Sequence, residues 1–386
     1  MNKGVVTPVG KVHYALLNAY AKNWRLKRAG PGQGGQNSVP GLDKADARRH
    51  IRLMENQSFS AGAMPVALDR CEGYDRQSLD RLTGDVLDAA RIAQFHSLKP
   101  GTRVLVKPNL LMGKPLACTS PGVVAAACRW LRDHGAQMAV ADSPGFGRAV
   151  AVARAIGLES SLRPLGLAVR ELDRPVPVRL DTDLPAGLQG GRGGRKRPSF
   201  QVSSAVQECD FILSLPRVKA HGQMLLTLAV KNCFGCVSGL HKAVAHAREG
   251  RDPVYFADCL AALWAALPPV AALADGGVAM HRTGPSKGEA FVLKLMGASP
   301  SAVALDEALY AVFGLGPQDV PLGAALARRK APGSAAAGTE MAFPLLRPED
   351  FDARGFELPQ RLSHTSFHPA RFVQSCLRRA IAAIKK

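Results

Sequence analysis

Apolar and polar residues alternate along this chain in blocks that are typical of strands and helices in turn. Short apolar runs predict strands at 64–68, 102–107, 137–141, 211–215, 270–274 and 290–295. Apolar residues recur at helical spacing between several of them, as from Val123 to His134. Ser120 and Pro121 mark the start of that helix and Gly135 its end. The pattern predicts an α/β fold, a layered parallel or mixed sheet with helices on both faces.

The patterned part of the chain, 64–325, predicts one α/β domain. Residues 1–63 are polar and rich in glycine around 30–35, which predicts a flexible basic extension. Residues 326–386 contain many prolines and predict an irregular tail. From Pro369 onward, apolar residues return at helical spacing beside arginines and lysines, so we expect the tail to end in a basic amphipathic helix.

The net charge of the 386-residue chain is +19, with 50 lysines and arginines against 31 acids. Of this excess, 16 charges lie in the extension 1–63, the glycine–arginine loop 188–198 and the end 363–386. The α/β part is therefore nearly balanced. Aromatic residues are only 6% of the chain and no nucleic-acid motif is present, which disfavours a nucleic-acid or membrane-surface binder that acts through the basic segments.

Cysteine use and the start of the chain indicate a cytoplasmic protein. The eight cysteines are spread along the sequence, unlike a disulfide scaffold, and the first thirty residues lack a secretory signal. Only Cys233 and Cys236 form a C-x-x-C pair. They are a candidate metal or redox site, but two ligands do not complete one, and His221 and His246 would have to supply the others.

Polar side chains follow several of the predicted strands. Ligands of open α/β sheets bind outside the carboxyl ends of the strands, so these residues are the first candidates for a site. Lysine and asparagine bind carboxylates and phosphates, and histidine transfers protons. The residues after the strands are Lys107, Asn109, Asp142, Ser143, Lys219, His221 and Asp275, and a second group follows at Lys231, Asn232, Lys242 and His246.

These residues predict a pocket for a small anionic ligand. The predicted catalytic residues are His221, as general acid or base, with Lys219 and Asp275. Asp275 or Asp142 would orient a cation or a hydroxyl group. The predicted ligand-binding residues are Lys107, Asn109, Asp142, Ser143, Lys231, Asn232, Lys242 and His246.

Several of these segments, in this order, resemble the family known as domain of unknown function 362. The matching segments are 104–111, 141–145, 215–221, 226–235 and Gly284-Pro285 with Gly288. The resemblance implies a compact α/β domain, and redox chemistry because many members carry a ferredoxin module with four-iron clusters. Here the end of the chain has one cysteine, Cys376, so electrons would need a separate partner or a bound cofactor. Ser301 stands where the family usually has an aspartate.

The fold is also distantly similar to the nickel-dependent lactate racemase family, whose lysines and histidines hold a pyridinium-derived nickel cofactor. The leading hypothesis is thus a cofactor-dependent, oxidoreductase-like protein that binds a small anion, with the cofactor and the substrate left open. One alternative is a metal or iron–sulfur accessory protein that uses Cys233 and Cys236. The other is a non-catalytic binder of nucleic acid or an acidic partner.

Overall fold

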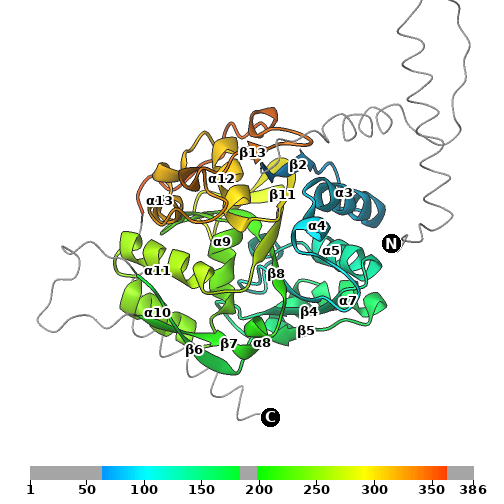
Figure 1. Ribbon diagram of the computed structural model, residues 1–386, viewed down its shortest axis with the longest axis horizontal. Coiled ribbons are helices and arrows are strands. Elements are labelled where there is room, and N and C mark those ends of the chain that lie inside the picture. Colours follow the sequence, from blue (N-terminus) through cyan, green and yellow to red (C-terminus); the bar gives the residue numbers. More distant parts are fainter. Residues whose placement is uncertain (1–62, 183–197, 363–386) are drawn as a thin grey trace, which may run out of the picture. The chain divides into compact units, whose positions relative to one another are not determined.

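A mixed sheet forms the centre of the computed structural model, which describes residues 63–182 and 198–362 (Figure 1). The main strand order is β10 (Leu225–Thr227), β9 (Arg217–His221), β11 (Val270–His281), β8 (Phe211–Leu215), β3 (Arg103–Pro108), β4 (Gln137–Asp142) and β5 (Val169–Glu171). The neighbours β8, β3, β4 and β5 are parallel, so their carboxyl ends share one edge. β12 (Glu289–Ser299) pairs antiparallel with β11 and with β2 (Ala67–Arg70).

Helices cover both faces of this sheet (Figure 1). On one side lie α3 (Arg76–Ala89), α4 (Ile92–Phe95), α5 (Pro121–Asp133), α6 (Ala149–Ala155) and α7 (Leu158–Leu162). On the other lie α9 (Ala229–Asn232), α10 (His241–Glu249), α11 (Pro253–Ala265), α12 (Ala302–Val312) and α13 (Pro321–Arg328). The predicted α/β fold class is confirmed.

The first predicted helix shows how closely local sequence signals mark an element. α5 begins at Pro121 and ends before Gly135, whose φ of 75° is left-handed. Ser120 occupies the predicted cap position, but its side chain makes no cap hydrogen bond. Its backbone N–H instead donates to Asp275 Oδ2 at 2.7 Å, so the start of the helix is tied to the central sheet.

Two segments that the sequence places after strands lie within strands. β11 does not stop at Ala274 but continues through Asp275 to His281, because β12 pairs with it along most of its length. Gly277 lets the strand pass close to Tyr74, whose hydroxyl a Cβ would approach to 2.5 Å. Residues 217–221 form β9, which pairs with β10 and β11. Asp275 and Lys219 therefore project from the sheet itself.

Residues after 325 pack on the same core as the residues before them. β13 (Met341–Ala342) pairs in parallel with β1 (Met64–Pro65), and Phe351 is buried in the main hydrophobic cluster. The short strands β6 (Pro175–Arg179) and β7 (Ser199–Ser203) pair antiparallel. α8 (Ser204–Gln207) then leads toward β8.

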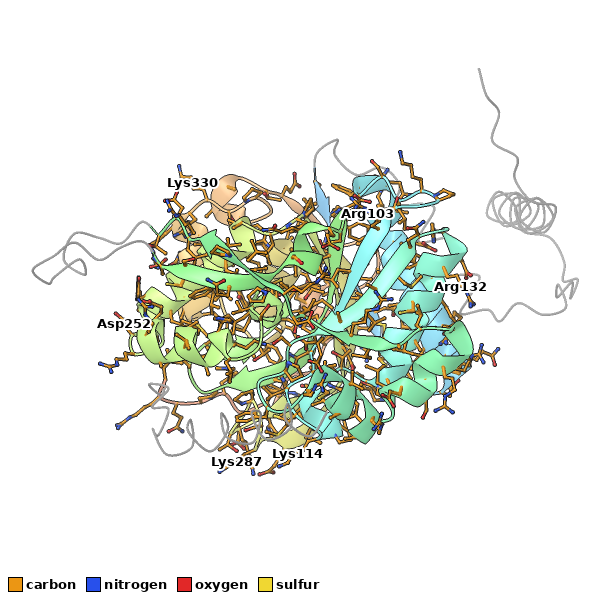
Figure 2. All side chains as sticks on the ribbon, turned by 90° about the horizontal axis from the view of Figure 1, so that it is seen from below. Arg103, Lys114, Arg132, Asp252, Lys287 and Lys330 are labelled. Atoms are coloured by element: carbon orange, nitrogen blue, oxygen red, sulfur yellow. The ribbon has the colours of Figure 1, made fainter. Side chains whose placement is uncertain are left out.

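The predicted extension 1–63, except for its last residue, lies outside the described residues. So do nearly all of the glycine–arginine loop and the predicted C-terminal helix. Within the described ranges, no helix has the length and apolarity needed to cross a membrane. Figure 2 shows Arg103, Lys114, Arg132, Lys287 and Lys330 at the outside of the described structure, where all five are exposed.

Candidate functional site

The carboxyl ends of β3 and β4 bring Lys107 and Asp142 into a buried ion pair. Lys107 Nζ lies 2.6 Å from Asp142 Oδ1, and the two side chains are 0% and 2% exposed. Asp142 Oδ2 also accepts the backbone N–H of Leu110 at 2.7 Å. Gly235 packs directly on this pair, because a Cβ there would collide with Lys107 Nζ and Asp142 Oδ1. The pair is neutral as a unit and is closed off by the turn that contains Cys233 and Cys236.

Two asparagines connect this pair to Lys219. Asn109 Nδ2 donates to Asn232 Oδ1 at 3.0 Å, and Asn232 Nδ2 donates to Ser214 Oγ at 3.1 Å. Lys219 Nζ donates to Asn109 Oδ1 at 2.5 Å and to the carbonyl of Ala117 at 2.8 Å. Both acceptors of the Lys219 amine are neutral, so its charge is solvated by dipoles but not cancelled.

α9 carries Lys231 and Asn232 and is held by a buried carboxylate from α12. Asp306 accepts the backbone N–H of Ala229 at 2.7 Å and that of Val230 at 3.0 Å. These are among the first N–H groups of α9, which lack partners inside the helix. Burial raises the pKa of Asp306 to about 7, although both N–H bonds act to lower it. Asp306 therefore fixes the direction in which α9 presents its last residues.

Lys231 and Lys242 contact one aromatic cluster formed by Phe234, Phe256 and His246. Lys231 Nζ lies 5.0 Å from the ring centre of Phe234 and 5.9 Å from that of Phe256. Lys242 Nζ lies 5.9 Å from the Phe234 ring and also donates to the carbonyl of Ser143. His246 meets the same ring at 5.0 Å. Lys242 and His246 lie one turn apart on α10.

Three of the buried lysines lack an opposite charge. Lys219, Lys231 and Lys242 are 1%, 8% and 9% exposed, and none of them forms an ion pair with a described carboxylate. Burial is the largest cause that lowers their pKa values, to about 7 for Lys219 and Lys242 and about 8 for Lys231. A buried amine without a carboxylate loses its proton more easily, because its charged form has lost the stabilisation by water and has gained no opposite charge in its place.

The two histidines lie within the same group of cations. Burial, followed by repulsion from Lys231, holds the pKa values of His221 and His246 well below the usual range. His221 Nδ1 lies 3.1 Å from the backbone N of Gln223 and 3.2 Å from that of Met224, and it accepts both N–H groups. The proton of the neutral ring is therefore on Nε2, which donates.

Asp275 lies in a second cluster and is surrounded by donors. Tyr74 Oη donates to Asp275 Oδ1 at 2.6 Å, and Arg217 Nη1 reaches the same oxygen at 3.1 Å. Burial acts to lower the pKa of Arg217, but Asp275 and Tyr74 outweigh it and raise it. Asp275 thus orients a guanidinium and a hydroxyl group that both belong to the protein.

One segment joins the two clusters. The carbonyl of Ala117 accepts Lys219 and that of Cys118 accepts Arg217 Nε at 2.8 Å. Thr119 Oγ1 donates to the carbonyl of Leu215 and accepts the backbone N–H of Asn109. The residues that sequence reasoning missed are Tyr74, Thr119, Arg217 and Asp306. Asp306 had a visible signal, as a carboxylate inside the apolar run 302–312, and so did Arg217, which follows the predicted strand 211–215.

Cys233 and Cys236 lie in a buried 3-10 turn after α9. Burial raises the pKa of Cys236 to about 12 and that of Cys233 well above its usual value. Metals and clusters bind the thiolate, which this environment disfavours. In 63–182 and 198–362, no three side chains of His, Cys, Asp or Glu gather as metal ligands, so His221 and His246 do not complete a set. The described residues therefore do not fit an iron–sulfur cluster.

A cavity of about 630 Å³ lies away from the lysines, against β3, β4, β5 and α8. None of the predicted site residues lines it. Its polar lining is of mixed charge and includes Arg103, Arg170, Arg174, Glu171, Asp173 and Glu208.

Comparison with known proteins shows the family to which the chain belongs. The domain of unknown function family DUF362 matches residues 104–311. Over 333 residues the chain is 31% identical to the thylakoid-associated protein sll1697 of Synechocystis sp., covering 85% of this chain and 93% of that protein. The protein belongs to the DUF362 family. The matched segment contains every site residue that the sequence predicts, from Lys107 to Asp275.

A crystal structure of a Thermotoga maritima protein aligns with 53% of this chain at 10% identity, with a TM-score of 0.32. The alignment spans about half of that protein, 51%.

The DUF362 motif Gly284-Pro285 has a structural reason next to the site. A Cβ at Gly284 would collide with the carbonyl oxygen of Ala220, which lies between Lys219 and His221 in β9. The carbonyl of Gly284 also accepts the N–H of Gly222 at 3.3 Å. The glycine thus lets this loop contact the strand that carries two of the three predicted catalytic residues, Lys219 and His221.

Proposed function

We propose that this DUF362 protein binds a small anionic ligand among Lys219, Lys231 and Lys242. The observation that carries the proposal is the Lys231 amine. It is nine-tenths buried and contacts two aromatic rings, and it has no ionic or hydrogen-bonding partner among the described residues. A buried cation without a partner is costly, and a bound anion would supply the missing charge.

The neighbouring residues would position the ligand. Asn109 and Asn232 hold Lys219, and Lys242 donates to the carbonyl of Ser143, which follows the Lys107–Asp142 pair. His221 is neutral, and because its Nδ1 accepts two backbone N–H groups it would donate a hydrogen bond to the ligand from Nε2–H. Asp275 would act as a positioning residue through Arg217.

The family resemblance favours redox-linked chemistry, in which a separate partner or an unidentified cofactor carries the electrons. We also propose a cytoplasmic location. The thylakoid association named for the Synechocystis relative makes the surface of an internal membrane the alternative for this chain. Fractionation of cells that express the full chain tests this: recovery in the washed membrane pellet would contradict a freely cytoplasmic protein.

Isothermal titration of the full-length protein with inorganic phosphate tests the ligand proposal. We expect K231M to weaken phosphate binding at least tenfold, because methionine keeps the length of the side chain but removes its charge. K99M is the matched control, since Lys99 is exposed and lies before the amino end of β3, opposite Lys107. Equal phosphate affinity in the wild type, K231M and K99M would overturn the proposed site.

A further inference from the structure

We propose that the ligand of this site is a dianion, a phosphate monoester or a dicarboxylate, and that the site takes up protons when it binds. This inference rests on the proposed anion-binding function and specifies the ligand's charge. It follows from the number of buried charges around the site and from the aromatic ring that two of the amines share.

The buried charges around the site do not balance. Two cations are matched, because Lys107 pairs with Asp142 at 2.6 Å and Arg217 with Asp275 at 3.1 Å. The three amines of Lys219, Lys231 and Lys242 remain without a carboxylate in the described chain. A ligand with one negative charge would compensate only one of the three amines. A ligand with two negative charges would allow two amines to be charged together.

Two of the amines lie beside the same aromatic ring, and Lys231 acts electrostatically on both of the others. Lys231 and Lys242 approach the same Phe234 ring, at 5.0 and 5.9 Å from its centre. Lys231 also interacts electrostatically with Lys219, since the charge of Lys231 lowers the pKa of Lys219. A ligand that contacts Lys231 therefore lies in the field of both other amines.

The described carboxylates nearest the amines are already engaged by other donors. Asp142 is engaged by Lys107 and by the N–H groups of Leu110 and Ser143, each at 2.7 Å. Asp306 accepts two N–H groups at the start of α9. The other titratable and charged groups around the three amines are Lys107 from β3, Asp142 from β4, His221 from β9, His246 from α10, Asp306 from α12, and the thiols of Cys118, Cys233 and Cys236.

Proton uptake follows from the same arrangement. Near pH 8 the three amines are only partly protonated, since their pKa values are about 7 to 8. A bound dianion favours the charged form of each amine and raises its pKa. Protons must therefore enter the site from the buffer as the ligand binds.

Matched pairs of probes separate charge from shape. Full-length protein is titrated at pH 8 with succinate against monomethyl succinate, and with methyl phosphate against dimethyl phosphate. We expect at least one dianion to bind tenfold or more tightly than its methylated partner. The pair that shows the preference tells a dicarboxylate site from a phosphate site. Repeating the titration in buffers of different ionisation enthalpy measures the protons taken up.

The outcomes distinguish this inference from the function beneath it. Equal affinity within both pairs, or tight dianion binding without proton uptake, overturns the dianion inference while the anion site stands. Absence of binding by all four probes and by inorganic phosphate overturns both. In K231M we expect the preference for the dianion to fall by at least tenfold, and in K99M we expect it to be unchanged.

Discussion

Two buried polar clusters lie side by side in this protein and differ in charge balance. Around Asp275, a carboxylate faces Arg217 and Tyr74, and every charge has an opposite partner. Around Lys231, three amines and two histidines share a buried space with no carboxylate of their own. The pKa of Arg217 lies above its ordinary value, whereas the pKa values of the three lysines lie below theirs. The comparison teaches that the charges of the first cluster are compensated within the fold, whereas the second contains three buried amines that pair with no described carboxylate.

The largest effect should follow from breaking the balanced cluster. We expect D275N to lower the free energy of unfolding by about 3–5 kcal/mol, because Arg217 would remain buried without its counter-charge. Urea denaturation followed by circular dichroism measures the change. The double variant R217M/D275L removes both charges and should lose less stability than D275N. A D275N protein as stable as the wild type would contradict the structural role of Asp275.

The unbalanced cluster should respond in the opposite direction. We expect K231M to raise the free energy of unfolding of the ligand-free protein by about 1–3 kcal/mol, because it removes a buried charge that nothing in the described chain compensates. The same urea experiment measures it, with K99M as the control. Destabilisation by K231M similar to that by D275N would show that the two clusters do not differ as described.

The pH dependence sharpens the same contrast. The pKa values of Lys219, Lys231 and Lys242 fall from about 10.5 in the unfolded chain to about 7–8 in the fold, so the unfolded chain binds more protons in between. Their contribution to the stability of the ligand-free protein therefore rises as the pH increases from about 7 to about 10. Anion affinity should fall over the same window, because the amines lose their charge.

The difference between wild type and K231M isolates this contribution from that of other groups, such as Asp306. We expect the curve of unfolding free energy against pH to be flatter for K231M above pH 7. Parallel curves for the two proteins would mean that Lys231 keeps an ordinary pKa in the fold.

The smallest effect is expected at the cysteines. C233A/C236A should change phosphate affinity less than twofold, because both thiols are buried and protonated and neither contributes charge to the site. Phosphate titration together with elemental analysis of both proteins checks this. Loss of a stoichiometric metal along with phosphate binding in the double variant would favour the metal alternative instead.

Much of the site was visible in the sequence because it follows the carboxyl ends of strands. Parallel pairing places Lys107 opposite Ser214 and brings Asp142 beside it, as the strand pattern predicts. Tyr74 was missed because it occupies no distinctive position along the chain. Arg217 follows the predicted strand 211–215, as Lys219 does, but nothing in the sequence shows that Asp275 lies beside it. Tyr74 reaches Asp275 from 201 residues away, a contact that no local pattern encodes.

The strand ends around Asp275 were also misplaced for a physical reason. The two glycines that follow Asp275, Gly276 and Gly277, are typical of a turn and by themselves favour one. The long partner strand β12 overrides that preference by supplying hydrogen bonds from Ala272 to His281. Tertiary pairing thus turned a predicted strand end into the middle of a strand, and with it placed Asp275 against Arg217.

The sequence by itself determined the α/β fold, the helix limits and the types of residue at the strand ends, because periodicity and capping act over a few neighbouring residues. Only the tertiary structure decided which charges are neutralised. Ion pairing and burial depend on distances between residues far apart in the chain, and these distances left Lys107 and Arg217 paired and Lys231 without a counter-charge.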